Sequence, residues 1–349
     1  MKNNKAIIYA EGRYQCADGK TAHGLVRHSK KFQIQCVIDS TTPEGDAGDI
    51  LDGHFRNIPL VHDLKQAFST YDAGTFIIGA VTEGGMLPPG YDTAVTLALH
   101  NGLDIVSGLH QFLSDIPNFK KIAQQHNSKI IDVRKIFRDH RRFYTGEIDN
   151  VHSIRIAILG TDSAIGKRTI AVMLDEALKK QGKTSEMIYT GQTGWMQGWP
   201  HGIILDAMIN DFVSGGIEGA IIDSWNDTKP EYIIIEGQGS LVHPFFPGGY
   251  EILAAGKVHG FIVVHAPKRS NLDGFPAYPM PNPDRVIKIA ELLTEKPLIA
   301  IGLNNENMNS ADIQHYKKLY HQRYNVPIVE PLSEGVKNII DKMVEMYGK

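Results

Sequence analysis

A short segment rich in glycine and charge, residues 160–169, has the residue types needed to bind phosphate. It reads Gly-Thr-Asp-Ser-Ala-Ile-Gly-Lys-Arg-Thr, follows the apolar run 154–159 and precedes 170–180, which has the apolar spacing of a helix. Strand, glycine-bounded loop and helix in this order place backbone N–H groups and a lysine ammonium around an anion. The sequence therefore predicts a phosphate-binding loop. Its expected binding residues are Gly160, Thr161, Asp162, Ser163, Gly166, Lys167, Arg168 and Thr169.

The loop departs from the common pattern Gly-x4-Gly-Lys-Ser/Thr, in which the hydroxyl coordinates Mg²⁺. Here five residues separate Gly160 from Gly166, and Arg168 stands where the hydroxyl residue is expected. Thr169 follows one position later, and because a helix turns about 100° per residue, its side chain points in another direction. This departure counts against metal coordination by the loop hydroxyl, and no metal ligand is predicted for the main interpretation.

Two predicted strands end in a group that can accept a proton. Glu236 follows the apolar run 232–235 and leads into Gly-Gln-Gly-Ser, and His265 ends the run 260–264. A carboxylate at the end of a buried strand beside a phosphate loop is often a Mg²⁺ ligand or a base in nucleotide enzymes. Histidine is the side chain most often used for proton transfer. We predict Glu236 and His265 as catalytic residues; a tight turn and a hydrogen-bonded strand-end histidine are the structural alternatives.

Other polar residues near predicted strand ends are candidates for substrate binding. Thr-Gly-Gln-Thr-Gly at 190–194 offers hydroxyl and amide groups, and Lys-Arg at 268–269 could hold a carboxylate or a phosphate. Ordinary turns with solvated charges explain the same residues equally well. The predicted substrate-binding residues are Gln192, Thr193, Asp206, Asp211, Gln238, Ser240, Lys268 and Arg269.

Apolar strands that alternate with helical patterns must position these residues, and this alternation is typical of α/β folds. We predict strands near residues 6–10, 33–38, 75–80, 104–106, 129–133, 154–159, 184–189, 232–235, 260–265 and 297–301. We predict helices near residues 63–68, 92–101, 118–125, 170–180, 203–210, 286–293, 312–320 and 336–347.

The order of these elements predicts two domains. Residues 1–150 are expected to form a Rossmann-like open sheet that ends in a charged linker, 135–150, and residues 151–349 a P-loop NTPase-like α/β domain. The dinucleotide fingerprint G-x-G-x-x-G is absent after the first strand, where the chain reads Glu11-Gly12-Arg13-Tyr14, so an NAD site is not supported. Ligands should collect at the carboxyl ends of the strands.

Composition limits the class of protein. The net charge of −3 and the absence of a Lys/Arg tract give no sign of a nucleic-acid partner. Cys16 and Cys36 are the only cysteines, so neither a disulfide framework nor a zinc site is indicated. The apolar run 6–10 is too short for a secretory signal or a membrane span. We expect a cytoplasmic protein, not bound to membranes, with a small-molecule substrate and a homo-oligomeric state.

The motifs together resemble a known family. Gly-Thr-Asp-x3-Gly-Lys at 160–167 and Glu-Gly-Gln-Gly-Ser at 236–240 are similar to segments of dethiobiotin synthetase and of the cobyric acid synthase amidotransferases. The closer resemblance is to the DgcN-like family, which pairs an N-terminal Rossmann-like domain with a C-terminal P-loop domain. It also rests on T-G-Q-T-G at 190–194, D-x4-D-F at 206–212 and H-x-P-x-R at 265–269, and it covers nearly the whole chain.

This resemblance implies an acyltransferase, because the family includes enzymes that acetylate the nitrogen of D-glutamate with acetyl-CoA. Coenzyme A carries a pyrophosphate and a 3′-phosphate, so the loop would hold the donor, and backbone N–H groups around residues 237–240 could stabilise an oxyanion. The alternative is an ATP- and Mg²⁺-dependent ligase or kinase of a small carboxylate, as in dethiobiotin synthetase, in which Glu236 would bind Mg²⁺. A nucleotide-binding regulatory or assembly protein without turnover is a third possibility.

Overall fold

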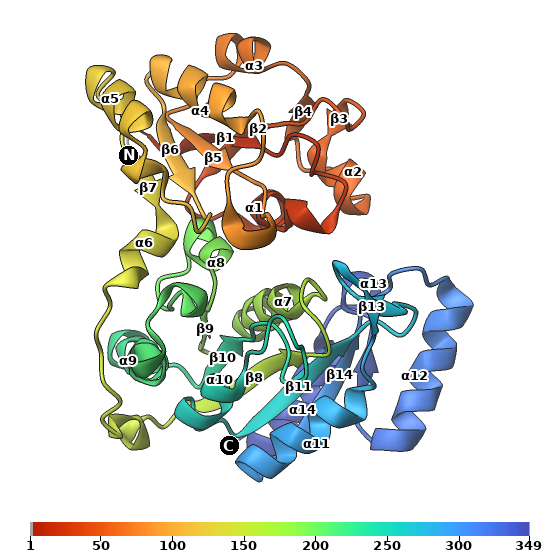
Figure 1. Ribbon diagram of the computed structural model, residues 1–349. Coiled ribbons are helices and arrows are strands. Elements are labelled where there is room, and N and C mark those ends of the chain that lie inside the picture. The colour runs from red at the N-terminus through yellow and green to blue at the C-terminus, as the bar shows by residue number, and fades with distance from the viewer. Residues whose placement is uncertain (1–2, 349) are drawn as a thin grey trace. The chain divides into compact units, whose positions relative to one another are not determined.

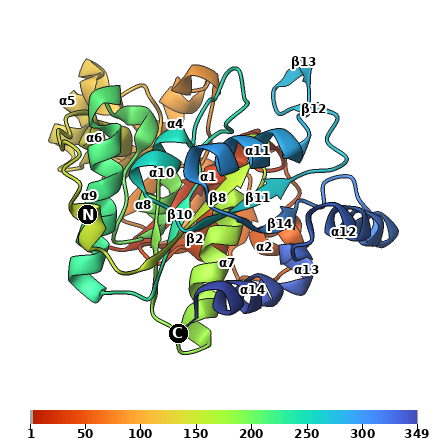
Figure 2. The same ribbon diagram turned by 90° about the horizontal axis from the view of Figure 1, so that it is seen from below.

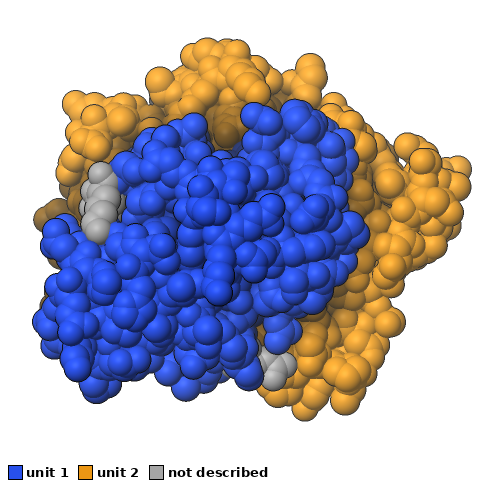
Figure 3. Space-filling view, turned by 90° about the horizontal axis from the view of Figure 1, so that it is seen from above, with its two compact units in different colours: residues 1–140, 191–200, 206–208 blue, residues 141–190, 201–205, 209–349 orange. Residues whose placement is uncertain are grey.

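The apolar runs assemble into two large sheets, one in each of two units. Figure 3 shows the two units in different colours. The structure is a computed structural model that describes residues 3–348. The first unit consists of residues 1–140, 191–200 and 206–208, and the second of residues 141–190, 201–205 and 209–349. The sequence predicts a single boundary at residue 150. In the structure the chain returns to the first unit twice after that residue, with the segments 191–200 and 206–208.

The first unit is built on a seven-stranded sheet with the order β3-β4-β2-β1-β5-β6-β7, parallel except for the pair β3–β4. The helices α3, α4 and α5 cover one face and α1 the other (Figure 1). Tyr9 of β1 packs against Phe76 of β5 and Tyr91 of α4 in the core between the sheet and α4. The elements of this unit are β1 (Lys5–Tyr9), α1 (Lys20–His28), β2 (Gln33–Ile38), β3 (Gly45–Asp46), α2 (Ala47–Asp52), β4 (Pro59–Val61), α3 (Leu64–Thr70), β5 (Thr75–Ile78), α4 (Tyr91–His100), β6 (Asp104–Ser107), α5 (Pro117–Gln125), β7 (Ile130–Asp132), α6 (Val133–Arg138) and α8 (Gln192–Gln197).

The carboxylate at the end of β2 explains how the first unit differs from a dinucleotide-binding domain. Asp39, in the position from which such domains bind ribose, is buried and accepts hydrogen bonds from the backbone N–H groups of Gly12, Tyr14 and Thr41 and from the hydroxyls of Thr41 and Thr42. These donors hold the pKa of Asp39 below its ordinary value, although burial opposes them. The carboxylate therefore fixes the turn after β1.

The second unit is built on a six-stranded parallel sheet with the order β15-β14-β11-β8-β10-β9. The helices α7 and α14 lie on one face, and α10 and α11 lie on the other (Figure 2). Its elements are β8 (Ile154–Gly160), α7 (Lys167–Lys180), β9 (Ser185–Ile188), α9 (Asn210–Thr228), β10 (Tyr232–Glu236), α10 (Tyr250–Ala255), β11 (Gly260–His265), β12 (Asn271–Leu272), β13 (Phe275–Pro279), α11 (Pro283–Thr294), β14 (Leu298–Leu303), α12 (Ser310–Tyr324), β15 (Ile328–Val329), α13 (Pro331–Glu334) and α14 (Lys337–Tyr347).

Most predicted strands and helices are confirmed to within a few residues, but the predicted helix at 203–210 is wrong. That stretch contains only a short 3-10 turn, Leu205–Ala207, and the long helix α9 begins at Asn210. The helix α9 is buried over most of its length and lacks a polar stripe, so it has no amphipathic pattern. The glycines of this helix also suggest a loop in the sequence. In the structure Gly215 is needed for close packing, because a Cβ at this position would lie 2.0 Å from the carbonyl oxygen of Arg142. The segment predicted as a linker therefore packs directly on this helix.

No helix in residues 3–348 is both long and apolar enough to cross a membrane.

Candidate functional site

The glycine-bounded loop connects β8 to α7 at the carboxyl end of the sheet, as predicted. Gly166 has a φ of +105° immediately before α7, a backbone conformation that favours glycine. At the other end of the loop, a Cβ on Gly160 would come within 2.9 Å of the side chain of Ile165. The loop geometry thus favours glycine at both positions. The loop leads into the first turn of α7, whose N–H groups have no partner within the helix.

The lysine of the loop points inward. Lys167 is 7% exposed, and its ammonium donates to the carbonyl oxygens of Asp162, at 2.6 Å, and Gly239, at 2.8 Å. Gly239 belongs to the turn after β10. The lysine therefore connects the loop to the Glu-Gly-Gln-Gly-Ser segment, and its positive charge lies among backbone oxygens where a phosphate could compete for it.

Arg168, in the position of the usual hydroxyl residue, forms an ion pair with Glu236. The Nη2 atom of the arginine lies 2.6 Å from Oε1 of the carboxylate, which is 4% exposed. The second carboxylate oxygen accepts a hydrogen bond of 3.1 Å from the backbone N–H of Thr190. The Nε atom of Arg168 is buried and has no hydrogen-bond partner among the described residues. Glu236 is thus engaged on both oxygens, and the arginine keeps a donor to offer.

Asp162, in the middle of the loop, is fully buried and surrounded by donors. Its Oδ2 atom accepts from Arg269, at 2.8 Å, and from the backbone N–H of Asp273, at 2.9 Å. Arg269 also pairs with Glu306 at 2.6 Å. The Nε2 atom of His243 lies 3.3 Å from Oδ1 of Asp162. These contacts fix the shape of the loop from two other segments of the second unit.

His243 was not predicted from the sequence, although it follows Glu236 by only seven residues. It is 2% exposed, and its Nδ1 atom accepts hydrogen bonds from the backbone N–H groups of Phe245 and Phe246. Nε2 therefore carries the ring proton, and it lies near Asp162 without forming a hydrogen bond to any described residue. Burial lowers the pKa of His243 although Asp162 opposes this effect, so the ring is neutral. In the sequence, the one sign of a functional role for His243 is its position three residues after the glycine-rich segment 236–240.

His265 ends β11 beside the start of the loop. Its Nδ1 atom lies 2.9 Å from the hydroxyl of Thr161, and the ring makes an edge contact with Tyr320. Burial, reinforced by the charge of Arg269, lowers its pKa to about 4. The Nε2 atom has no hydrogen-bond partner among the described residues. His265 is therefore a neutral base with one nitrogen bound to the loop and the other available.

The predicted substrate-binding residues are divided between the two units. Gln192, Thr193 and Asp206 belong to the first unit, in which Arg134 donates to Gln192 and forms a two-point ion pair with Asp206. The hydroxyl of Thr193 lies 3.0 Å from that of Thr21 in α1. Arg134 was not predicted, because a lone arginine in a charged segment carries no pattern.

The other predicted substrate-binding residues belong to the second unit. Gln238 donates to the carbonyl oxygen of Thr190 at 2.5 Å, and Ser240 is buried in the turn that follows. Lys268 pairs with Asp312 at 2.6 Å, and Asp211 lies exposed in the first turn of α9. Both cations expected to hold a substrate carboxylate, Lys268 and Arg269, are thus paired within the unit. Their role toward a substrate stays a prediction.

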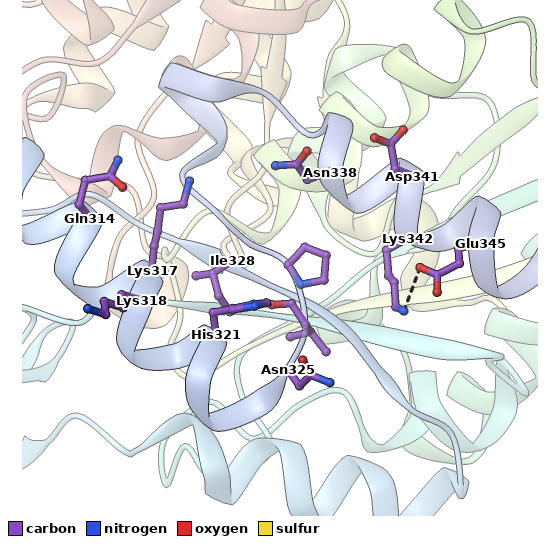
Figure 4. Close-up of a pocket in the computed structure, with 12 residues that line it drawn as sticks. Gln314, Lys317, Lys318, His321, Asn325, Ile328, Asn338, Asp341, Lys342 and Glu345 are labelled. Atoms are coloured by element: carbon purple, nitrogen blue, oxygen red, sulfur yellow. Dashed lines mark hydrogen bonds and ion pairs between the residues drawn. The ribbon is translucent and has the colours of Figure 1, made fainter.

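A separate surface pocket of about 700 Å³ lies between α12, the segment that enters β15, and α14 (Figure 4). Its lysines are largely neutralised, since Lys317 pairs with Glu334 and Lys342 with Glu345. The pocket reaches residues 325–328, which lie at the amino end of β15, whereas the loop lies at the carboxyl ends of the strands. It is therefore not part of the phosphate-loop site.

The loop presents N–H donors, the groups that bind an anion. Lys167, the first turn of α7 and the unpartnered Nε of Arg168 all offer N–H groups to an anion. The described residues contain no group of three or more His, Cys, Asp or Glu side chains placed to hold a metal. The carboxylate that would be expected to anchor Mg²⁺, Glu236, is instead bound to a guanidinium.

Comparison with known proteins matches this architecture over both units. The model of the DUF1611 C-terminal P-loop domain matches residues 142–340, and that of the DUF1611 N-terminal Rossmann-like domain matches residues 40–136, which confirms the predicted fold. A crystal structure of a DUF1611 family protein from Anabaena variabilis superimposes with a TM-score of 0.90 at 26% identity and covers 98% of this chain and 100% of that one.

Two curated relatives carry a function in their names. A protein from a Pseudoalteromonas species named D-glutamate N-acetyltransferase is 30% identical over 279 residues, which are 77% of this chain and 80% of that protein. A protein of the same name from Tritonibacter scottomollicae is 28% identical over 318 residues, 89% of this chain and 93% of that protein.

Proposed function

The chain belongs to the DUF1611 family, and on that premise we propose that it transfers an acetyl group from acetyl-CoA to the amino group of an acidic amino acid such as D-glutamate. The observation that carries the proposal is the similarity to two relatives named D-glutamate N-acetyltransferase over most of their length. The phosphate loop supports it, because a loop that offers N–H groups without a metal suits the phosphates of coenzyme A.

In this proposal the loop holds the donor. The N–H donors for the phosphates come from Lys167, from Arg168, whose Nε has no partner, and from the first turn of α7. Thr169 lies in the same turn and would add its hydroxyl. Lys167 already bonds to backbone carbonyls, so a phosphate oxygen would replace one neutral acceptor by a charged one. A charged acceptor makes the stronger hydrogen bond.

The reaction requires one proton acceptor. The amine nitrogen attacks the thioester carbonyl carbon, a C–N bond forms and the C–S bond breaks. The nitrogen gives up a proton, and the coenzyme A sulfur takes one up. Of the two predicted acceptors, Glu236 is held by Arg168, whereas Nε2 of His265 is available. We therefore favour His265, oriented by Thr161, and treat Glu236 as the residue that orients Arg168.

The alternative, an ATP- and Mg²⁺-dependent ligase or kinase, requires Glu236 to be free for the metal. Its ion pair with Arg168 argues against that arrangement. A nucleotide-binding regulator without turnover would bind the same ligands but release no product. Assays of product formation distinguish all three.

The direct test incubates the purified protein with acetyl-CoA and D-glutamate. We expect release of the coenzyme A thiol together with N-acetylglutamate, identified by mass spectrometry, and a lower rate with L-glutamate as the matched acceptor. Replacing Lys167 with Ala should raise the KM for acetyl-CoA far more than that for the amine. Unchanged values of both parameters would show that the loop does not hold the donor. Consumption of Mg-ATP without thiol release would replace acetyl transfer by the alternative.

A further inference from the structure

The position after the loop lysine is the one at which phosphate loops usually anchor Mg²⁺, and here it carries Arg168. The second usual anchor is an acid at the end of a neighbouring strand. Glu236 has that place, because β10 pairs with β8 and aligns Glu236 with Ile158, two residues before the loop. The 2.6 Å ion pair therefore joins the two protein positions that would otherwise share a metal ion.

The arginine is only partly satisfied by this pair. One nitrogen, Nη2, faces Glu236, while Nε is buried without a hydrogen-bond partner among residues 3–348. A buried N–H group without an acceptor is costly. Nε itself is shielded from solvent, but the side chain as a whole is 22% exposed, so a ligand can reach the outer N–H groups of the guanidinium. A guanidinium binds phosphate through two parallel N–H···O bonds, which an ammonium cannot form.

We propose that Arg168 takes the place of the divalent cation in this phosphate loop. Glu236 orients the guanidinium, and its remaining N–H groups bind phosphate oxygens directly, so that ligand binding is independent of metal. Glu236 is then a positioning residue. The inference rests on the proposed function only in taking coenzyme A as the ligand.

The exchange of a metal for an arginine also changes the charge of the site. Mg²⁺ beside one carboxylate leaves a net charge of about +1, whereas the pair Arg168–Glu236 is neutral. Lys167 then supplies the main full positive charge that the loop presents.

The test measures binding of coenzyme A and of ADP by isothermal titration calorimetry, in EDTA and in millimolar Mg²⁺, without any turnover. For the wild-type protein we expect a coenzyme A affinity that changes less than about twofold between the two conditions. Arg168→Ser restores the usual hydroxyl and should weaken binding in EDTA by about 10- to 100-fold, since it removes charge-assisted hydrogen bonds. Mg²⁺ should recover a substantial part of that loss in Arg168→Ser alone.

Arg168→Lys is the matched control, because it keeps a cation beside the buried Glu236. It should fold, bind coenzyme A several-fold more weakly than the wild type and stay insensitive to Mg²⁺. An affinity of the wild type that rises several-fold with Mg²⁺, or wild-type affinity of Arg168→Ser in EDTA, would overturn the inference. Metal-independent binding of ADP with no binding of coenzyme A would uphold it while refuting the proposed acetyl donor.

Discussion

Acidification should destabilise the second unit through His265, which is held neutral beside the phosphate loop. Burial, reinforced by the charge of Arg269, lowers its pKa from the ordinary value of 6.5 to about 4. In the unfolded chain the ring takes up its proton near pH 6.5, whereas in the folded unit it does so only near pH 4. The unfolded state therefore binds more protons between these values, and stability is lost as the pH falls through this range.

The size of the effect follows from the difference between the two pKa values. It corresponds to about 3 kcal/mol when complete, and about 2 kcal/mol of this is already lost at pH 5. For a unit of 150–250 residues, 1 kcal/mol shifts the melting temperature by about 2–4 °C. Protonation of His265 should thus lower the melting temperature of the second unit by about 4–8 °C between pH 7.5 and pH 5.

Differential scanning calorimetry of the full chain at these two pH values measures the effect when the wild type is compared with His265→Asn. Asparagine can keep a polar atom near the Nδ1 position that faces Thr161, but it does not titrate. The acid-induced shift should be about 4–8 °C smaller in this variant. His315→Asn, a change at an exposed position of α12, should leave the shift as in the wild type. An equal shift in His265→Asn and wild type would show that His265 is not held neutral.

Three further substitutions test the packing around the site and in each unit. Gly237→Ala places a Cβ 1.9 Å from the carbonyl oxygen of Ile158, so we expect a loss of about 1–3 kcal/mol or more in urea unfolding; a wild-type midpoint would contradict the close approach of the strands. Asp39→Asn replaces an acceptor of five hydrogen bonds by an amide with one oxygen, and circular dichroism should show a melting temperature several degrees lower. Glu218→Ala removes the buried carboxylate that accepts from Thr145, and limited proteolysis should then cut within residues 141–150 faster than in the wild type.

Many strands and helices could be predicted because a single period runs through the element. The predicted strands are apolar runs bounded by turns, and α14 repeats apolar residues every three to four positions. The helix α9 could not be predicted because burial on most sides removes the polar stripe, and its glycines, needed for contact with residue 142, suggest a loop. The returning segments 191–200 and 206–208 were missed for another reason. Membership of a unit depends on long-range contacts such as Arg134–Asp206, which leave no local pattern.

The loop itself could be predicted from residue types, since its geometry depends on local backbone freedom and on the helix that follows. The partners of its side chains could not. Lys268 and Arg269 look free in the sequence, but Asp312 and Glu306, some 40 residues away along the chain, pair with them. His243 likewise gains its role only from the fold, which brings it to Asp162. Long-range pairing decides which polar groups remain available to a ligand.

The same reasoning changes how a departure from a motif should be interpreted. In the sequence, Arg168 only removes a hydroxyl, while Glu236 remains an independent candidate for a base or a metal ligand. The parallel register of β8 and β10 places Glu236 near the loop, and Arg168 in the first turn of α7 pairs with it. The arginine thus supplies the counter-charge for the carboxylate. An isolated loss of the hydroxyl would leave a buried carboxylate without a cation, which is strongly unfavourable. Because Arg168 replaces the hydroxyl and also pairs with Glu236, the loop is better explained as a different way to bind phosphate than as a metal site that has lost a ligand.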